Sequence, residues 1–196
     1  NGCEVKDTVE IYAMGYNLSD DYEASAPAES NLCTDTFDLA TIEPTNTGDE
    51  GEWSAIQGNA VFDNSTTFST VARDLEQGTN TLRWTALVTS ESKDCIFNSD
   101  VELVNDLPNQ PQAGIDRTVC TEDVALNAVE PELGSGEWSV VETGSHAFDD
   151  KSFRNTDVYD INRNTNTFVW TVEHNGCELT DTLVIYSPRI NTANAG

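Results

Sequence analysis

Apolar residues alternate with polar ones over short stretches of the chain, and no stretch shows the three-to-four-residue spacing of an amphipathic helix. Glycine, proline, asparagine and serine residues separate these stretches, as turns require. The pattern predicts strands near residues 37–42, 51–56, 60–62, 67–72, 81–89, 100–104, 124–128, 136–141, 147–150, 157–161, 167–172 and 183–186. Many short strands with frequent turns are typical of immunoglobulin-like sandwiches, so we expect an all-β chain.

The second half of the chain repeats the first. Residues 80–88 around Trp84 match residues 166–172 around Trp170, and in both places a cysteine and a strand that opens on aspartate follow. Matching residues are offset by about 85 positions, which is close to the size of one sandwich. We therefore expect tandem immunoglobulin-like β-sandwiches, arranged as beads on a string, each with its own core.

Residues 1–12 repeat the end of this unit once more, so we expect the chain to be a segment of a longer array. The expected division is the end of a preceding repeat plus a linker at residues 1–20, repeats at 21–107 and 108–190, and the start of a following repeat at 191–196. Pro108 and Pro111 mark the junction, because proline ends sheet pairing and stiffens the backbone.

Each repeat carries two tryptophans on separate strands, Trp53 and Trp84 in the first and Trp138 and Trp170 in the second. Their spacing predicts that the two rings of a pair lie in facing sheets of one core. The repeated Gly-Glu-Trp sequence also has an alternative reading, in which Trp53 and Trp138 are exposed and stack on sugar rings. Alternation with apolar neighbours favours the core.

The chain is strongly acidic, with 35 aspartates and glutamates against 9 lysines and arginines and a net charge of −26. Such a surface repels phosphate backbones and anionic lipids, so nucleic acid is not an expected partner. No stretch approaches the ~18 apolar residues of a membrane span, so membrane insertion is not expected either. The acidity either solvates an extracellular surface or attracts divalent cations.

The five cysteines follow the repeat: Cys33 matches Cys120, while Cys3, Cys95 and Cys177 match one another. This arrangement predicts the disulfides Cys33–Cys95 and Cys120–Cys177, and it leaves Cys3 alone because its partner would precede residue 1. The alternatives are unrelated buried thiols or metal ligands, although the chain has no C-x-x-C pair. Paired disulfides indicate an oxidising, extracytoplasmic compartment.

No residues form a recognisable catalytic motif. His146 and His174 each lie beside a turn and neither is repeated, so we expect them to be exposed loop residues. The chain has no nucleophile elbow, zinc-binding H-E-x-x-H, phosphate-binding loop or dinucleotide-binding glycine motif. Composition alone does not exclude a carboxylate pair of the glycosidase kind. We expect no enzymatic activity and no catalytic residues.

Calcium is the metal that the composition leaves open. Asp106 and Asp116 flank the junction, where a cation could stiffen an array. The acidic groups at residues 20–21, 49–52 and 149–150 offer further oxygen ligands. None of these groups has the spacing of a calcium-binding loop, so we expect no cofactor, with calcium at Asp106 and Asp116 as the alternative.

The motifs of the second repeat together resemble the PKD-like, immunoglobulin-like repeats of very large Bacteroidetes cell-surface proteins. The best-known of these are gliding-motility adhesins of the SprB type, which the type IX secretion system exports. The resemblance covers nearly all of the second repeat and less of the first, where Pro27 and Glu29 replace Gly114 and Asp116. The residues that carry it are residues 113–116, 119–120, 126–128, 136–141, 166–172, 176–177 and 181–182.

The resemblance implies a structural segment of a secreted adhesin filament on the outer cell surface, in contact with neighbouring repeats of the same chain and with a substratum or surface polysaccharide. It also implies O-glycosylation at Asp-Thr sites, for which Thr8 and Thr182 qualify; plain structural threonines are the alternative. Since exported enzymes carry similar repeats as spacers, the alternative function is a carbohydrate-binding or spacer module of an exported multidomain hydrolase.

Overall fold

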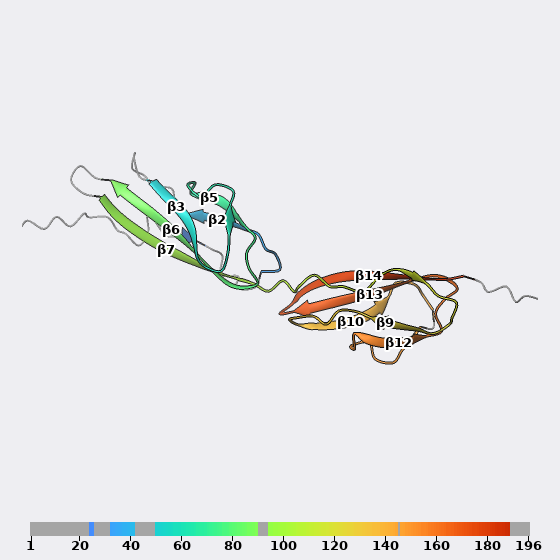
Figure 1. Ribbon diagram of the computed structural model, residues 1–196. Helices are drawn as coiled ribbons and strands as arrows, with labels where there is room; N and C mark the ends of the chain where they lie inside the picture. The colour runs from blue at the N-terminus through green and yellow to red at the C-terminus, as the bar shows by residue number, and fades with distance from the viewer. Residues whose placement is uncertain (1–23, 26–31, 42–49, 90–93, 145, 189–196) are drawn as a thin grey trace, which may run out of the picture.

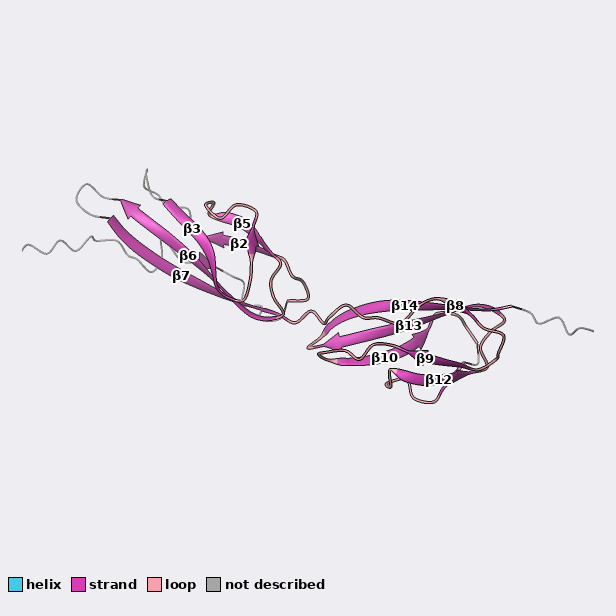
Figure 2. Cartoon of the chain, in the orientation of Figure 1, coloured by secondary structure: helices cyan, strands magenta, loops and turns pink. Residues whose placement is uncertain are grey.

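The structure is a computed structural model of the chain, and it describes residues 24–25, 32–41, 50–89, 94–144 and 146–188. Of residues 24, 25, 88, 89, 94 and 95 it describes the backbone alone. The described residues form two immunoglobulin-like β-sandwiches placed end to end (Figure 1). Figure 2 shows that strands and loops make up all of this part of the chain. The expected all-β class is confirmed, with one core in each sandwich.

The N-terminal sandwich contains two sheets. One has the strand order β1-β2-β5-β4 and the other β3-β6-β7. The long pair β6 and β7 runs the length of the sandwich as an antiparallel hairpin. The bounds are β1 Ala24–Ser25, β2 Phe37–Thr41, β3 Glu50–Gln57, β4 Val61–Phe62, β5 Ser69–Arg73, β6 Gly78–Thr89 and β7 Asp94–Asn105.

The C-terminal sandwich repeats this plan with the orders β10-β13-β14-β8 and β11-β12-β9. Its long hairpin is β13 and β14, which corresponds to β6 and β7. The bounds are β8 Arg117–Thr118, β9 Val124–Asn127, β10 Ser135–Val140, β11 Ala147–Phe148, β12 Asn155–Tyr159, β13 Asn164–His174 and β14 Cys177–Ser187. The short β8 pairs in parallel with the end of β14, and the alternation pattern did not predict it.

The tryptophan pairs lie within one sheet, so the expectation of facing sheets is wrong. Trp53 on β3 is directly opposite Trp84 on β6, and their ring centroids are 5.4 Å apart. Trp138 on β10 and Trp170 on β13 repeat this arrangement at 5.1 Å. Both members of a pair point to the same side of the sheet, because directly opposed residues on neighbouring strands share a face.

Each tryptophan pair sits at the centre of a separate hydrophobic core. All four rings are at most 1% exposed. In the N-terminal core, Leu39 comes from the opposite sheet, and in the C-terminal core, Leu126 and Val158 do so. Since these two clusters share no residue, residues 106–112 connect two separately packed bodies.

A buried asparagine fixes the same turn in both sandwiches. Asn80 donates from Nδ2 to the carbonyl of Glu76 (2.7 Å) and accepts the amide of Glu76 at Oδ1 (3.0 Å). Asn166 makes the same two bonds with Asn162, at 2.8 Å and 2.7 Å. Both asparagines are fully buried, and the backbone groups of the turn satisfy their side-chain amides inside the core.

Candidate functional site at the junction of the sandwiches

The two sandwiches meet where the hairpin turn between β13 and β14 reaches the end of β7 (Figure 1). Asn175 and Gly176 form the turn, with φ angles of 50° and 87°. Asparagine and glycine tolerate these positive angles, as a tight two-residue hairpin turn requires. Glu173 accepts the amide of Gly176 at 2.7 Å, which holds the turn in shape. The turn therefore projects as a rigid tip toward the N-terminal sandwich.

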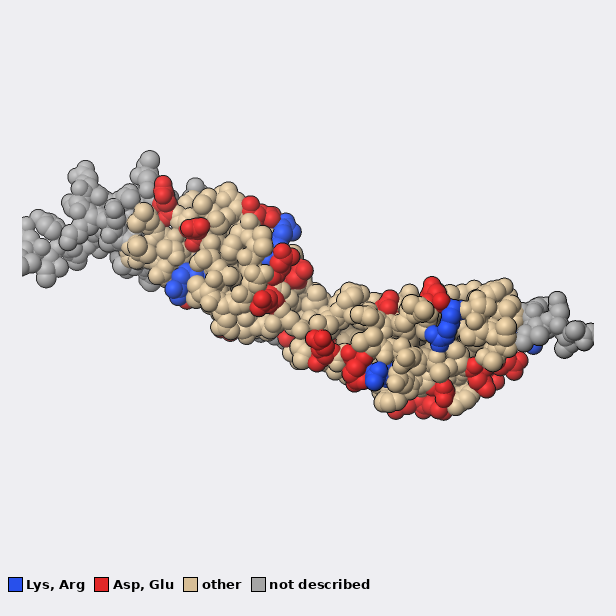
Figure 3. Space-filling view, in the orientation of Figure 1, with Lys and Arg blue, Asp and Glu red and all other residues tan. Residues whose placement is uncertain are grey.

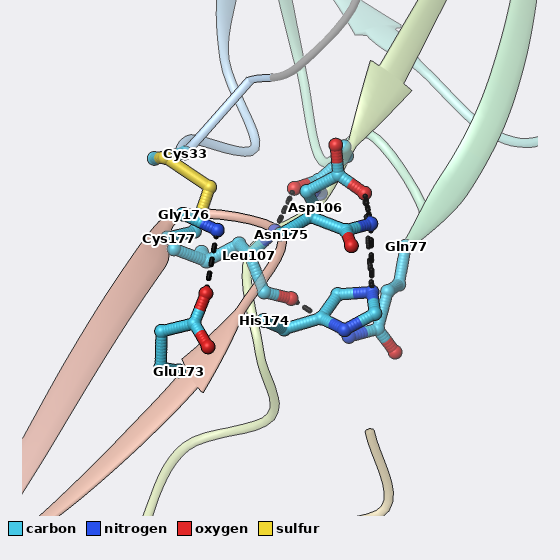
Figure 4. Close-up of a disulfide and its surroundings, with 10 residues drawn as sticks. Cys33, Gln77, Asp106, Leu107, Glu173, His174, Asn175, Gly176 and Cys177 are labelled. Atoms are coloured by element: carbon cyan, nitrogen blue, oxygen red, sulfur yellow. Dashed lines mark hydrogen bonds and ion pairs between the residues drawn. A yellow bond between two sulfur atoms is a disulfide. The ribbon is translucent and has the colours of Figure 1, made fainter. Parts of the chain in front are cut away.

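A disulfide between Cys33 and Cys177 crosses the junction (Figure 4). Their Cα atoms are 5.2 Å apart, within the usual range for such bonds, and 144 residues separate them in sequence. The predicted pairs Cys33–Cys95 and Cys120–Cys177 are therefore wrong, because each uses one of these two cysteines. The cysteine at the hairpin of one sandwich bonds to the first cysteine of the sandwich before it.

The length of the hairpin explains why a bond within one sandwich fails. Leu32, next to Cys33, bridges to Asn105 at the end of β7, whereas Cys95 lies near its start. Ten residues of strand separate these positions, about 33 Å at the usual rise per residue. In the C-terminal sandwich, β14 separates Cys177 from the Cys120 end in the same way.

The structure describes the thiol of only one of the remaining three cysteines. Cys120 carries a free, exposed thiol. Cys3 and the side chain of Cys95 lie outside the described residues, so the prediction that Cys3 is unpaired remains a prediction.

A buried carboxylate lies beside the disulfide. Asp106 is 5% exposed and accepts a hydrogen bond from Asn175 Nδ2 at 2.8 Å. The imidazole Nε2 of His174 is 3.9 Å from the same carboxylate oxygen. Burying a carboxylate is costly unless donors surround it, so Asp106 depends on the hairpin of the next sandwich for its partners.

A second side chain fixes the start of the connecting segment. Gln77 donates from Nε2 to the carbonyl of Leu107 at 2.7 Å. The amide of Leu107 is in turn held by Asn105 Oδ1 at 3.0 Å. The first residues of the connecting segment are thus fixed to the N-terminal sandwich before the chain enters the next one.

The far end of the connecting segment is fixed to the C-terminal sandwich. The amide of Ala113 donates to Asp181 Oδ2 at 2.8 Å, and Ala113 is fully buried. The amide of Val129 donates to the carbonyl of Gln112 at 2.9 Å. Hydrogen bonds therefore fix the connecting segment to a sandwich at each of its two ends.

Neither histidine is an exposed loop residue as predicted. His146 is half-buried, with Nε2 3.0 Å from Asn166 Oδ1 and its ring edge-on to Phe168. The His174 side chain is 24% exposed and faces Asp106. The missed signal for His174 was its position directly before the Asn-Gly turn, which places it at the tip of a long hairpin.

The two aspartates considered for calcium do not converge. Asp106 faces the hairpin turn, whereas Asp116 Oδ1 accepts the amide of Val184, far along β14. Among the other acidic groups, residues 149–150 are engaged locally, since Asp150 accepts from Ser152 and Asp149 accepts from Tyr159. In the 49–52 group, Glu52 accepts from Ser65 Oγ at 3.5 Å, whereas residues 20–21 and 49 lie outside the described residues. Within the ranges that the structure describes, no three cysteine, histidine or acidic side chains form a metal-binding group.

The remaining candidate residues are the threonines considered for glycosylation and the tryptophans considered for sugar stacking. Thr182 is exposed on β14 opposite Val169, while Thr8 lies outside the described residues. Trp53 and Trp138 are buried, so they form part of the core and offer no sugar-stacking surface.

Acidic side chains are spread over both sandwiches on the face seen in Figure 3. Four arginines form ion pairs with carboxylates, namely Arg73–Asp63, Arg83–Asp100, Arg154–Glu130 and Arg163–Glu122. Among the described residues there is no helix with the length and apolarity to cross a membrane.

No family model and no curated protein matches this chain. Solved structures with a similar arrangement include extracellular domains 3–5 of Drosophila OTK, at 9% identity over 86% of this chain and 60% of that one, with a TM-score of 0.35. The fibronectin(III)-like modules of Clostridium thermocellum CbhA match at 10% identity over 85% of this chain and 94% of theirs, with a TM-score of 0.30.

A third similar structure is a SusE-like surface-located polysaccharide-binding protein from the Bacteroides thetaiotaomicron heparin utilisation locus. It matches at 10% identity over 80% of this chain and 32% of that one, with a TM-score of 0.34. The likeness extends to the β-sandwich fold alone, so the function is argued from the junction.

Proposed function

We propose that this chain is a structural repeat segment of a large secreted cell-surface adhesin filament, that it serves surface attachment and gliding motility, and that it has no enzymatic activity. The junction carries the proposal. A disulfide and a buried carboxylate connect consecutive sandwiches in addition to the backbone itself. A filament must keep its units in line under load, and a second covalent connection between neighbours resists both bending and separation.

The burial of the tryptophans favours a filament over a carbohydrate-binding module. Sugar-binding modules commonly stack rings on exposed aromatic side chains. Here the repeated tryptophans are at most 1% exposed and serve the two cores. The proposed partners are neighbouring repeats of the same chain and the substratum or surface polysaccharide that the filament touches.

An outer-surface location agrees with the disulfide. Disulfides persist in oxidising compartments and are reduced in the cytosol. The acidic surface keeps a long array soluble and prevents neighbouring filaments from associating. Export by the type IX secretion system, and glycosylation at the exposed Thr182, belong to the same proposal.

Small-angle X-ray scattering tests the stiff-spacer function. The intact chain should give one narrow distribution of interatomic distances that fits the end-to-end arrangement. The double variant Cys33→Ser with Cys177→Ser should broaden this distribution, because the backbone segment 106–112 becomes the sole covalent connection. Cys120→Ser is the matched control and should leave the scattering unchanged. Equal scattering from the double variant and the wild type would remove the disulfide from the proposed mechanism.

A cellular experiment tests the adhesin function. Antibodies against the C-terminal sandwich should label intact producing cells, and deletion of the array should reduce attachment to glass. If attachment is unchanged and an adjoining catalytic domain loses activity instead, the chain is the spacer of an exported hydrolase.

A further inference from the structure

The end of the C-terminal sandwich opposite the junction presents an exposed cysteine in a hollow. Cys120 lies there beside Glu122, Ile161, Arg163, Ser187 and Pro188, which come from three separate parts of the chain. The connection after β8, the turn before β13 and the end of β14 thus meet at this hollow.

This end is the counterpart of the N-terminal sandwich's junction end. The amide of Leu32 donates to Val104 at 2.9 Å, and the amide of Val119 donates to Tyr186 at 3.0 Å in the same place. Leu32 and Val119 directly precede Cys33 and Cys120. The backbone therefore holds the two cysteines in equivalent positions, each beside the end of the last strand.

The surroundings of the two cysteines also match. The amide of Leu75 donates to the carbonyl of Asp35, and that of Ile161 donates to the carbonyl of Glu122, both at 3.0 Å. Leu75 and Ile161 are buried, at 4% and 6% exposed. Two residues after each of these lies a donor side chain, Gln77 in the N-terminal sandwich and Arg163 in the C-terminal one.

In the N-terminal sandwich this equivalent site is occupied. Cys33 is bonded to Cys177 at the hairpin of the following sandwich, and Gln77 donates to the connecting segment. We propose that Cys120 forms the same bond with the hairpin cysteine of a third sandwich of this kind, so that disulfides link each sandwich to the next along the array.

The hairpin cysteines have the register that such a series requires. Cys177 is opposite His174, four residues before Asp181 meets Trp170. Cys95 is opposite Val88, four residues before Ser99 meets Trp84. Each sandwich thus carries one cysteine near the hairpin and another at the opposite end, and the sequence places Cys3 in the hairpin class. The bonding partners of Cys3, Cys95 and Cys120 would all belong to other sandwiches.

One residue difference distinguishes the Cys120 end of the C-terminal sandwich from the Cys33 end of the N-terminal sandwich. Pro188 takes the place of Asp106, because both follow the last strand directly. The next hairpin would therefore lose the carboxylate acceptor that Asp106 supplies, while Arg163, which lies 3.9 Å from Glu122, offers a donor in the position of Gln77. We expect the junction at Cys120 to depend on its disulfide more than the junction at Cys33 does, because no carboxylate takes the place of Asp106 there.

Bond formation requires an oxidant that carries a disulfide, such as an oxidised thiol–disulfide oxidoreductase or glutathione disulfide. The Cys120 thiolate attacks this disulfide and forms a mixed disulfide, which releases one thiolate of the oxidant. The hairpin thiolate then attacks the Cys120 sulfur and releases the second one. Two thiols lose two protons and two electrons, and the oxidant leaves as its dithiol or as two thiols.

A chain of three sandwiches tests the proposal. A second copy of residues 107–196, carrying Cys120→Ser, replaces residues 189–196, so that Pro188 leads directly into the copied segment. The chain is oxidised with glutathione disulfide, and free thiols are alkylated before trypsin digestion. Residues 118–151 should be linked to residues 164–189 of the second copy. Alkylation of Cys120 should fall about tenfold or more relative to the two-sandwich chain, because the partner is held nearby.

A matched variant with Cys177→Ser in the second copy alone should restore full alkylation of Cys120. The inference rests on the proposed function in one respect, namely that sandwiches of this kind follow one another. If Cys120 stays reactive while Cys33–Cys177 forms, this inference is overturned and the proposed function stands. If neither bond forms in folded protein, the junction mechanism of the proposed function fails as well.

Discussion

Gly51 and Gly136 explain the repeated Gly-Glu-Trp sequence at the level of single atoms. A Cβ atom on Gly136 would lie 2.0 Å from Trp170 Cζ2, and one on Gly51 would lie 2.0 Å from Trp84 Cζ2. Glycine therefore lets the indole of the neighbouring strand lie against the backbone. The motif is a packing requirement of the tryptophan pair, and it carries no sign of a binding function.

Substitution of this glycine should be costly. Gly136→Ala forces a buried indole to move, so we expect it to lower the free energy of unfolding of the C-terminal sandwich by about 3 kcal/mol. Gly176→Ala, where a Cβ meets nothing but φ is 87°, should cost about 1 kcal/mol. Denaturant unfolding followed by tryptophan fluorescence measures both. A loss for Gly136→Ala no larger than that for Gly176→Ala would contradict the claim that the indole contact requires glycine at position 136.

Glu142 gives the C-terminal sandwich a pH dependence. Burial pushes the pKa of its carboxyl upward, but hydrogen bonds from Thr167, whose amide donates at 2.6 Å, outweigh burial and lower the pKa below its ordinary value. A lowered pKa in the folded state means that the carboxylate stabilises the sandwich above the ordinary pKa, and that this stabilisation is lost as the pH falls through the lowered value.

The difference in unfolding free energy between wild type and Glu142→Gln should therefore shrink as the pH falls from about 6 to about 3. Urea unfolding at several pH values measures this difference. Glu137→Gln, which removes an exposed carboxylate on β10, controls for the change in net charge. A difference that stays constant or grows toward low pH would contradict the role assigned to Glu142.

At the scale of the strands, alternation predicted most of the sandwich correctly, and its failures have physical reasons. β6 and β7 are longer than predicted, because Gly78 and the strand start at Asp94 break the apolar alternation without ending the pairing. β8 has two residues, too few for any alternation. Ala55 lies two residues after Trp53 and should share its buried face. It is exposed because the register of β3 shifts between Ala55 and Gln57.

The candidate site was less predictable than the fold. The repeat shows which cysteines are equivalent, but it does not show which end of the sandwich each one occupies. That depends on the length of the β6–β7 and β13–β14 hairpins, which carry the hairpin cysteine to the end opposite Cys33 and Cys120. Asp106 was recognised from the sequence as a junction residue, but its partners Asn175 and His174 are 69 and 68 positions away and give no local signal.

The contact between the hairpin turn and Asp106 should protect the disulfide. Asp106→Ala removes the buried acceptor of Asn175 and leaves that donor without its partner, at a cost of about 1–3 kcal/mol to the junction. We expect dithiothreitol to reduce Cys33–Cys177 several-fold faster in this variant, as measured by timed alkylation. Asp116→Ala, which removes a carboxylate bonded to Val184, is the control. Equal rates in both variants would mean that the contact of Asp106 with the hairpin turn does not support the junction.

At the scale of the whole molecule, the disulfide changes how the chain carries force. Cys33 lies near the start of the N-terminal sandwich, and Cys177 opens the last strand of the next one. Tension between the termini passes from Cys33 through the disulfide to Cys177 and along β14. The intervening residues, which include all of the N-terminal core except Leu32 and most of the C-terminal core, are outside this path.

Single-molecule pulling should reveal this shielding. With the chain held by its ends, reduction should release the 144-residue separation between Cys33 and Cys177, which adds about 50 nm of contour length at about 3.6 Å per residue. Under oxidising conditions this length should stay hidden even at forces that unfold the sandwiches. The Cys120→Ser chain should behave as wild type. A full-length extension without reductant would exclude the covalent connection.

Peptide mapping of the intact chain under non-reducing conditions tests the junction disulfide most directly. Trypsin cleaves after lysine and arginine, and the sequence places each cysteine on a separate peptide, namely residues 1–6, 7–73, 94–117, 118–151 and 164–189. The junction described here predicts a linked pair of residues 7–73 and 164–189, with residues 118–151 carrying a free thiol. A link between residues 7–73 and 94–117, or between 118–151 and 164–189, would show that each sandwich closes its own disulfide and would contradict the covalent connection between neighbours.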